Sequence, residues 1–383
     1  MRTILFFQTG TPEIARTKLA GVTAYAHGRD WDIKFIERES PRLSVKKVLS
    51  FWKPDGCIVE ASGGANGLSP DAFGNIPVVY QCHDPRCIKG MTACVTSDSP
   101  AVSRIAAREL LRIGMSHFAF VSWFESVYWS DVKRDAFKKE LESLGHTCTT
   151  FTPTKGEARD EISLQRRLRE WIKTLPSPCG IFTVSDIIGV QILSACKAVK
   201  VSVPEEVAIL SVNNDEQICE AAVPSLSSIR LDYRRTGYLA AELLDRTMHG
   251  EKVKGHFTVP PGGIVRRAST RIFKRLDTES KLAVETIRRR ACDGLMPKDV
   301  LSLFSCSRRL AEIRFKAATG RTITEELQSV RMERVHELLS RPDVPISAIA
   351  NLCGWPSESF LRRLFRRTTG HSLSEERARI LSQ

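Results

Sequence analysis

The sequence predicts an α/β protein followed by an all-α region, and three observations support this prediction. Over the first 270 residues, short apolar runs alternate with patterns of helical period, which is typical of a parallel sheet with helices on both faces. The chain has 383 residues, more than one hydrophobic core usually holds, so we expect two or three domains. Near the carboxyl end, a sequence repeat has the layout of a helix-turn-helix rather than of strands.

The predicted strands are short runs rich in β-branched and aromatic residues, and the predicted helices fill most intervals between them. Because helices cover both faces of such a sheet, its strands can be apolar throughout. We expect strands at Ile4 to Phe7, Trp31 to Ile36, Gly56 to Glu60, Pro77 to Tyr80, Phe118 to Val121, Thr147 to Phe151, Gly180 to Val184 and Val207 to Val212. We expect helices at Glu13 to His27, Pro100 to Ile113, Asp131 to Leu144, Ile162 to Leu175, Ile187 to Val199 and Arg234 to Met248.

Polar and aromatic residues follow several of these strands. Ligands of open α/β sheets bind beyond the carboxyl ends of the strands, so we expect a binding crevice there. Aromatic rings beside polar groups suit a sugar-like ligand, although core or dimer contacts are the alternative for each ring. The loops concerned are Gln8 to Thr11, Ser62 to Gly64, Ser97 to Ser99, Ser122 to Trp129, Ser185 with Asp186, and Asn213 to Glu216. The candidate ligand-binding residues are Thr9, Asp98, Tyr128, Trp129, Lys133, Ser185, Asp186 and Asn213.

Several stretches of this region together resemble the LacI/GalR regulators and the type I periplasmic-binding-protein fold. They are Lys53-Pro-Asp-Gly-Cys-Ile-Val59, Val95-Thr-Ser-Asp-Ser99, Lys133-Arg-Asp-Ala-Phe137, Ile181-Phe-Thr-Val-Ser-Asp186 and Val203 to Asp215. The resemblance implies a sensor domain over residues 1–268, in which two lobes of parallel sheet close over a small ligand. It also implies a homodimer.

Two candidate ligand residues depart from the pattern of the sugar-binding members of that family. Lys133 stands where they often have Arg, and Asn213 stands where they often have Asp. Arg grips hydroxyls with a rigid fork that Lys lacks, and Asn exchanges part of the acceptor capacity of Asp for a donor. The departures predict either a ligand other than an ordinary pentose or a weakened sensor.

The carboxyl-terminal quarter contains an internal repeat. Phe315-Lys-Ala-Ala-Thr-Gly320 recurs fifty residues later as Phe365-Arg-Arg-Thr-Thr-Gly370. Each copy follows a short helix, a tight turn and a second, basic helix, in which Ser307 and Ser357 can act as N-caps. The expected helices are Pro297 to Phe304 and Ser307 to Ala318 in the first copy, Ile346 to Cys353 and Ser357 to Thr368 in the second, and Thr324 to Leu339 between the copies.

The second helix of each copy is predicted to enter the major groove of DNA. Residues 281–383 carry 19 Lys and Arg against 12 Asp and Glu, in a chain of net charge +13, which suits a polyanion. The alternative is an ordinary solvated helix face. The expected anchors to the core are Leu310, Phe315, Phe360, Leu361, Leu364 and Phe365. The candidate DNA-binding residues are Arg308, Arg309, Glu312, Lys316, Glu358, Ser359, Arg362, Arg363, Arg366 and Arg367.

This layout resembles the DNA-binding domain of the AraC family. Ile346-Ser-Ala-Ile-Ala-Asn-Leu-Cys-Gly-Trp355 matches the I-x-x-I-A-x-x-x-G-F pattern of that domain, with Trp355 in the Phe position; Leu373, Glu376 and Ala311 are further departures. The resemblance implies a DNA-binding domain over residues 282–383, with helix-turn-helix units at about 298–318 and 346–368. A basic linker at 269–281 would precede it. The basic residues in and just before this linker are expected near phosphates: Arg266, Arg267, Arg271, Lys274 and Arg275.

Together the two resemblances imply a ligand-responsive transcription regulator that binds double-stranded DNA, senses a sugar-like effector and controls carbohydrate-utilisation genes, with RNA polymerase as a further partner. The competing classes are a solute-binding protein and a doubly wound enzyme. We find no dinucleotide loop, phosphate loop or nucleophile elbow, so we expect no enzyme and no cofactor.

The cysteines and the apolar runs restrict metal binding and location. Eleven cysteines are scattered without a paired framework, as expected for reduced thiols in the cytoplasm. The cluster of Cys82, His83, Cys87 and Cys94 matches no zinc template, so we expect no metal. No apolar run is long enough for a bilayer span, and we expect no membrane partner.

Overall fold

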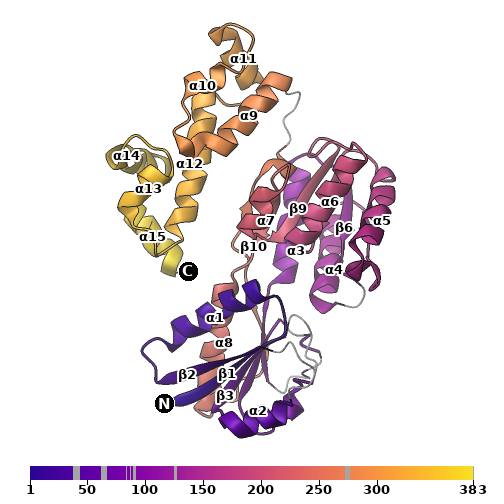
Figure 1. Ribbon diagram of the computed structural model, residues 1–383, viewed down its shortest axis with the longest axis vertical. Helices are drawn as coiled ribbons and strands as arrows, with labels where there is room; N and C mark the ends of the chain where they lie inside the picture. The colour runs from indigo at the N-terminus through magenta and orange to yellow at the C-terminus, as the bar shows by residue number, and fades with distance from the viewer. Residues whose placement is uncertain are drawn as a thin grey trace. The chain divides into compact units, whose positions relative to one another are not determined.

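The computed structural model describes residues 1–37, 44–61, 67–82, 84–86, 88, 92–124, 127–271 and 277–382 (Figure 1). Contacts divide the chain into two compact units, Met1–Ile272 and Phe273–Gln383. The first unit is α/β and the second is all-helical, as predicted.

The first unit contains two six-stranded sheets within the described part of the chain. The sheet of the N-lobe has the order β11-β5-β4-β3-β1-β2 and is parallel throughout. Its strands are β1 (Arg2–Gln8), β2 (Trp31–Glu37), β3 (Gly56–Glu60), β4 (Val78–Gln81), β5 (Ala93–Ser97) and β11 (Gly255–Val259).

The sheet of the C-lobe has the order β12-β10-β9-β8-β6-β7, and only β12 in it runs antiparallel to its neighbour among the described strands. The chain passes between the two sheets after β5, after β10 and after β11. The strands are β6 (His117–Val121), β7 (Cys148–Phe151), β8 (Cys179–Thr183), β9 (Val207–Asn213), β10 (Ser227–Arg230) and β12 (Ile264–Val265).

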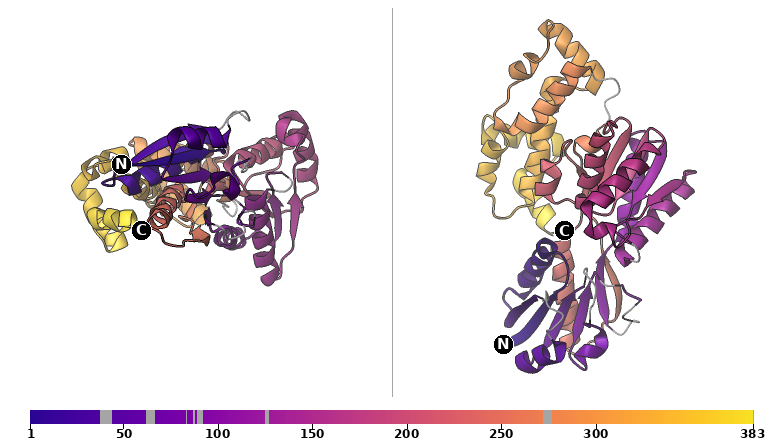
Figure 2. Two further views of the ribbon diagram at one scale, coloured as in Figure 1. Left: turned by 90° about the horizontal axis from the view of Figure 1, so that it is seen from below. Right: turned by 45° about the vertical axis from the view of Figure 1, so that its right-hand side comes forward.

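Helices cover both faces of the N-lobe sheet because successive strand residues point to opposite faces. Ile4 and Phe6 pack in the core under α1 (Pro12–Ala26) and α8 (Tyr233–Met248). Leu5 and Phe7 pack on the other face, under α2 (Val45–Trp52) and the 3-10 helix η1 (Pro70–Phe73). α1 and α8 lie side by side in each view (Figures 1 and 2).

The C-lobe sheet is covered in the same way. One face packs against α3 (Ser99–Arg112) and α4 (Tyr128–Ser143), and the other packs against α5 (Glu161–Lys173) and α6 (Asp186–Ala198). Polar side chains satisfy free amides where helices begin, including Asp98 at α3 and Asp160 at α5. The remaining helical elements are α7 (Glu216–Ala221) and the 3-10 helices η2 (Glu157–Arg159) and η3 (Ala268–Thr270).

The apolar-run rule found eight strands and missed β5, β10, β11 and β12. β10 shows the reason, since Ser227 and Ser228 are fully buried in it. Their hydroxyl groups are hydrogen-bonded to Thr270 and Asp186, so burial carries no unpaired polar group. The helices α2, α7, α9 and α15 were not predicted either.

The second unit has two hydrophobic cores joined by the long helix α12 (Ile323–Leu339). Ile323 and Leu327 belong to the first core, while Val335 and Leu338 belong to the second. Helices α9 (Thr278–Arg290), α10 (Pro297–Leu301) and α11 (Arg308–Thr319) and the 3-10 helix η4 (Ala291–Asp293) surround the first core. Helices α13 (Ile346–Leu352), α14 (Glu358–Thr369) and α15 (Leu373–Ser382) surround the second.

Direct contacts also hold the two halves of this unit together. Arg331, in the middle of α12, is buried and donates to the carbonyl oxygens of Ala291 and Leu295, each at 2.8 Å. Its guanidinium lies 5.6 Å from the centroid of the Trp355 ring in the second half. Gly354 has a φ of +68°, and a Cβ there would come within 2.7 Å of the Cys292 carbonyl oxygen. The turn of the second half therefore packs directly on the first half.

Within the described ranges, no helix combines the length and the apolarity that crossing a bilayer requires.

The contact between α1 and α8 depends on two glycines. A Cβ at Gly237 would lie 1.8 Å from the carbonyl oxygen of Lys18, and a Cβ at Gly21 would lie 1.9 Å from that of Arg234. These distances are far below van der Waals contact with backbone atoms that cannot rotate away. The two helices approach this closely only because both positions lack a side chain.

We therefore expect Gly237→Ala to destabilise the first unit by about 3 kcal/mol or more, since the helices must separate. Thermal unfolding of the full chain measures the effect. Gly156→Ala is the matched control, because the nearest atom to a Cβ there lies at 3.8 Å. Equal melting temperatures for the two variants would contradict the assigned contact.

Candidate functional site

The two repeated helices have equivalent boundaries. Ser307 accepts from the amide of Leu310 at the start of α11, and Ser357 accepts from that of Phe360 at the start of α14, so both predicted N-caps are confirmed. Gly320 and Gly370 end these helices in the left-handed conformation, with φ of 76° and 80°. The repeat in the sequence is therefore a repeat in structure.

The face predicted to enter DNA is open. Each of the ten candidate residues is exposed or, for Glu312 and Glu358, half-buried. Two predicted anchors are wrong: Leu310 and Phe360 are 47% and 37% exposed. Ala311 and Phe315 hold α11 to its core, and Leu361, Leu364 and Phe365 hold α14. The anchoring stripe is thus narrower than predicted.

The arginines of α14 differ in how they are bound. Arg362 donates from Nε to Glu358 Oε1 at 2.8 Å, one helical turn away. Among the residues that the structure describes, Arg363, Arg366 and Arg367 have no carboxylate within ion-pair distance. Three guanidinium groups on one helix are therefore free to contact an anionic partner.

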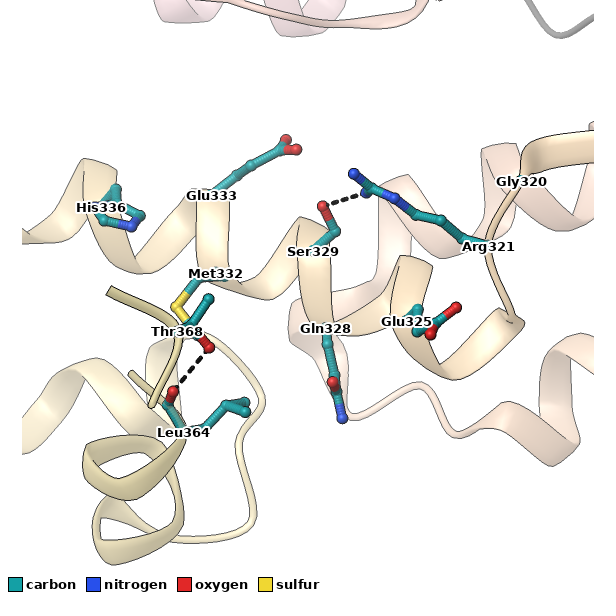
Figure 3. Close-up of a pocket in the computed structure, with 10 residues that line it drawn as sticks. All are labelled: Gly320, Arg321, Glu325, Gln328, Ser329, Met332, Glu333, His336, Leu364 and Thr368. Carbon is teal, nitrogen blue, oxygen red and sulfur yellow. Dashed lines mark hydrogen bonds between the residues drawn. The ribbon is translucent and has the colours of Figure 1, made fainter. Parts of the chain in front are cut away.

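A groove of about 520 Å³ along α12 separates the carboxyl ends of the two repeated helices. Gly320 and Arg321, at the end of α11, border one part of it, and Leu364 and Thr368 of α14 border another (Figure 3). Ser329 of α12 accepts from Arg321 at 2.7 Å. The turn that follows α11 and the carboxyl half of α14 therefore lie along the same groove beside α12.

In the first unit, Lys18 and Glu60 form a buried ion pair at the carboxyl end of the N-lobe sheet. Lys18 Nζ lies 2.7 Å from Glu60 Oε1 and donates to Cys82 Sγ at 3.1 Å. Burial opposes the charge of Lys18, but Cys82 and Glu60 raise its pKa to about 12. The amide of Gly10 donates to Glu60 Oε2 at 3.0 Å, so both carboxylate oxygens are occupied.

Three predicted ligand residues, Tyr128, Trp129 and Lys133, lie together at the start of α4. Lys133 is 5% exposed, and its Nζ lies 5.3 Å from the centroid of the Trp129 ring and 3.4 Å from the Trp129 carbonyl oxygen. No carboxylate in the described part of the chain pairs with it. Burial lowers the pKa of Lys133 to about 8, while the charge of Cys82, from the N-lobe, acts in the opposite direction. Arg86, also from the N-lobe, lies 5.3 Å from the Tyr128 ring.

Asp186 and Asn213 form a second group at the ends of the C-lobe strands. Asp186 is 2% exposed and accepts from Ser228 Oγ at 2.6 Å and from the Asp215 amide at 2.7 Å. Burial raises its pKa. Asn213 Oδ1 accepts at 2.7 Å from the hydroxyl of Tyr233, the first residue of α8, which leaves the Asn213 amide nitrogen as a donor.

The other three predicted residues, Ser185, Asp98 and Thr9, make local contacts. Ser185 accepts from the Ile188 amide at the start of α6. Asp98 accepts from the Ala101 amide at 2.8 Å at the start of α3. Thr9 donates from its hydroxyl to the Glu60 carbonyl oxygen at 3.0 Å. Helix capping and loop bonding account for these three contacts.

The sequence prediction omitted several polar residues at this junction of the lobes: Lys18, Glu60, Gln81, Cys82 and Tyr233. A signal for Lys18 was present, since it lies on the buried stripe of α1 with Ala15 and Val22, where a charge needs a partner. Gln81 is buried, and its Oε1 has no hydrogen-bond partner in the described ranges. Residues 62–64, 125 and 126 of the predicted loops, and His83 and Cys87 of the cysteine cluster, lie outside the described residues.

The segment that leaves the C-lobe toward the second unit is bound tightly to that lobe. Arg266 donates to both carboxylate oxygens of Glu109, at 2.6 and 3.0 Å. Arg267 pairs with Glu220 and donates to Asn214 Oδ1 at 2.9 Å. The expectation of phosphate contacts is therefore wrong for Arg266 and Arg267, because carboxylates of the sensor hold them. Lys274 and Arg275 lie outside the described residues.

The next residues of this segment are also buried. Ser269 donates to the Ile209 carbonyl oxygen at 2.6 Å and accepts from the Ser227 amide at 2.8 Å. Ser269 and Thr270, placed in the linker by the sequence, thus pack in the C-lobe. Arg267 links them to Asn214, which adjoins the candidate ligand residue Asn213.

Comparisons with known proteins agree with this architecture. A periplasmic binding protein-like domain matches residues 107–270, and a helix-turn-helix domain matches residues 301–379. The xylose operon regulatory protein of Haemophilus influenzae is 31% identical over 276 residues, 71% of each chain. That of Escherichia coli K12 is 28% identical over 372 residues, 92% of this chain and 91% of the relative. A structure of the xylose-binding transcription activator xylR matches with a TM-score of 0.65 at 25% identity, over 98% of each chain.

The fold and the two sites define a DNA-binding transcription regulator with a periplasmic-binding-protein-like sensor and an AraC-type double helix-turn-helix domain. The chain belongs to the family of the xylose operon regulatory proteins.

Glu109, the partner of Arg266, makes the stability of the first unit depend on pH. Burial alone would raise the pKa of this carboxyl, but hydrogen bonds from Arg112 and Arg266 lower it to about 2. A carboxyl with a lowered pKa stabilises the folded state above its unfolded value of 4.5 and stops doing so as the pH falls toward 2.

We expect Glu109→Gln to lower the stability of the first unit by about 2 kcal/mol at pH 7, because two arginines lose their shared partner. The difference from the unsubstituted chain should shrink between pH 5 and pH 2. Thermal unfolding at several pH values tests this, with Glu170→Gln, in an exposed pair with Lys173, as control. A difference that does not change with pH would contradict the assigned role.

Proposed function

We propose that this protein is a cytoplasmic one-component regulator that binds DNA as a homodimer and responds to a small sugar. Residues 1–270 would form the sensor, and residues 282–383 would form the DNA-binding domain. The observation that carries the proposal is the pair of repeated helices with exposed cations, α11 and α14, in a chain that also has a two-lobed sensor.

We assign DNA contacts to the exposed faces of α11 and α14. Residues near the amino end of a recognition helix reach base edges, and Lys and Arg further along find phosphates. The bases would be read by Arg308, Arg309, Glu312, Glu358, Ser359, Arg362 and Arg363, and the phosphates would be held by Lys316, Arg366 and Arg367.

We assign the effector to the junction of the two lobes. The relatives' names include xylose, which makes a pentose the first candidate. Both oxygens of Glu60 and of Asp186 are already occupied, whereas the ammonium of Lys133 and the amide nitrogen of Asn213 keep donor capacity. The free groups are donors, so they favour an effector rich in acceptor oxygens, with Trp129 and Tyr128 covering its apolar face. Thr9, Asp98 and Ser185 would complete the site.

The response to the effector would pass through residues 266–270, which lead from the C-lobe to the second unit. A ligand shifts the protein only if it binds one state better than the other. An effector on Asn213 would act on its neighbour Asn214, which donates to Ser228 and accepts from Arg267. A shift of this loop would therefore move the residues that lead to the DNA-binding domain, and RNA polymerase would be the further partner that reads the change.

A gel-shift titration with DNA from upstream of the gene, with and without xylose, arabinose, glucose and galacturonate, tests the whole proposal. A shifted band whose midpoint changes with one sugar is expected. An unshifted fragment would refute DNA binding and favour the alternatives of a solute-binding protein or an enzyme.

We expect Arg362→Ala to weaken operator binding by about 1 to 3 kcal/mol, or roughly 5- to 150-fold, if it reads a base. Arg246→Ala is the matched control, since Arg246 is also an exposed arginine in an ion pair, with Glu251, but lies in the sensor. Equal losses in both variants would show a general charge effect instead of a base contact.

We expect Lys133→Met to weaken effector binding about tenfold or more, because a charged hydrogen bond is lost while the packing volume stays similar. The measurement is the shift in melting temperature with sugar concentration. Lys139→Met, on the exposed side of the same helix, should leave this shift unchanged. An unchanged sugar response in Lys133→Met would remove Lys133 from the site.

A further inference from the structure

The two repeated helices differ at several outward-facing positions, and one of them pairs an apolar residue with a cation. The fifty-residue offset aligns Ile313 of α11 with Arg363 of α14. Ile313 is 56% exposed, and Arg363 is exposed too. Helical spacing puts Ile313 on the same face as Arg309 and Lys316, which are both candidate DNA-binding residues.

Packing within the protein does not explain the exposed isoleucine. The core under α11 is formed by Ala311 and Phe315, and Ile313 is absent from that core. Leu310, one turn earlier, is also 47% exposed. α11 therefore presents two adjacent apolar side chains to water. Their exposure to water is unfavourable, and a partner that covered them would remove this cost.

The charges around this apolar pair indicate the partner. Arg308 and Arg309 precede Ile313 and Lys316 follows it, all exposed, and the half-buried Glu312 lies between them. A protein partner that covered Leu310 and Ile313 would need carboxylates opposite the three neighbouring cations. The major groove of DNA instead offers thymine methyl groups between two rows of phosphates. The surroundings of Ile313 therefore match duplex DNA.

The corresponding position of α14 has different chemistry. Arg363 has no carboxylate within ion-pair distance among the described residues, unlike its neighbour Arg362, which is bound to Glu358. An unpaired arginine can donate two hydrogen bonds to the O6 and N7 atoms of guanine. An isoleucine can make only apolar contact with a base edge.

We propose that Ile313 recognises the 5-methyl group of a thymine and Arg363 recognises a guanine, so that the two helix-turn-helix units of one chain read different base pairs. The inference rests on the DNA binding proposed above. It makes each half of the operator asymmetric, with a fixed direction in which one chain lies along the duplex.

The test uses the full-length protein and an operator fragment located by footprinting. Each thymine in the footprint is replaced in turn by deoxyuridine, which removes only the methyl group. One replacement should weaken binding about fourfold, as expected for one buried methyl group. Ile313→Ala should bind the original fragment about fourfold more weakly and should lose its sensitivity at that position alone, while Ile313→Val keeps part of it.

Arg363→Ala should lose its sensitivity to one 7-deazaguanine replacement in the other part of the footprint. The matched control is Leu282→Ala, since Leu282 is 48% exposed on α9, outside both repeated helices. It should keep the full pattern of sensitivities.

Two results would overturn the inference. One is that Ile313→Ala retains every thymine sensitivity of the unsubstituted chain. The other is that Ile313→Ala binds the operator normally but activates transcription less, which would assign the apolar pair to a protein partner. Failure of the unsubstituted chain to shift any fragment is a different result, and it would refute DNA binding itself.

Discussion

The close approach of α1 and α8 is the constraint on which the sensor half of the structure depends. At Gly21 and Gly237 the two helix backbones touch, with no room for even a methyl group. The carbonyl that would meet a Gly237 side chain belongs to Lys18, whose ammonium is held against Glu60. Four residues before Gly237, Tyr233 begins α8 and donates to Asn213 of the other lobe. One backbone contact thus sets the position of groups in both lobes.

In the DNA-binding unit, the orientation of the two halves depends on a different contact, that of Arg331. Helix α12 contributes to two cores, and an isolated helix would leave the two halves free to turn about it. Arg331 prevents this by donating to two carbonyl oxygens of the first half while its guanidinium faces Trp355 of the second. A buried cation satisfied by backbone carbonyls fixes geometry because few orientations meet both acceptors.

Sequence patterns predicted the parts of this protein in which polarity follows secondary structure. The apolar runs located most strands of both sheets, and the repeat of the Phe315 to Gly320 motif located α11 and α14. The patterns failed where polar residues are buried or apolar residues are exposed. The serines of β10 are buried through hydrogen bonds to distant residues, and Leu310 and Phe360 are apolar yet exposed. At the junction of the lobes, Lys133 could be proposed from the sequence because it begins a recognisable motif, whereas Lys18 and Tyr233 required knowledge of which helices meet.

The bonding of residues 266–270 has a consequence for exchanging parts between regulators. Arg266, Arg267, Ser269 and Thr270 are all held by the C-lobe, so the sensor as a folded object continues past its last strand. A graft that joins this sensor to a foreign DNA-binding domain must keep those residues with the sensor. A junction placed just after β12 would leave Glu109 buried without one of its arginines and Ser227 without its hydroxyl partner. Both losses would destabilise the sensor of such a chimera.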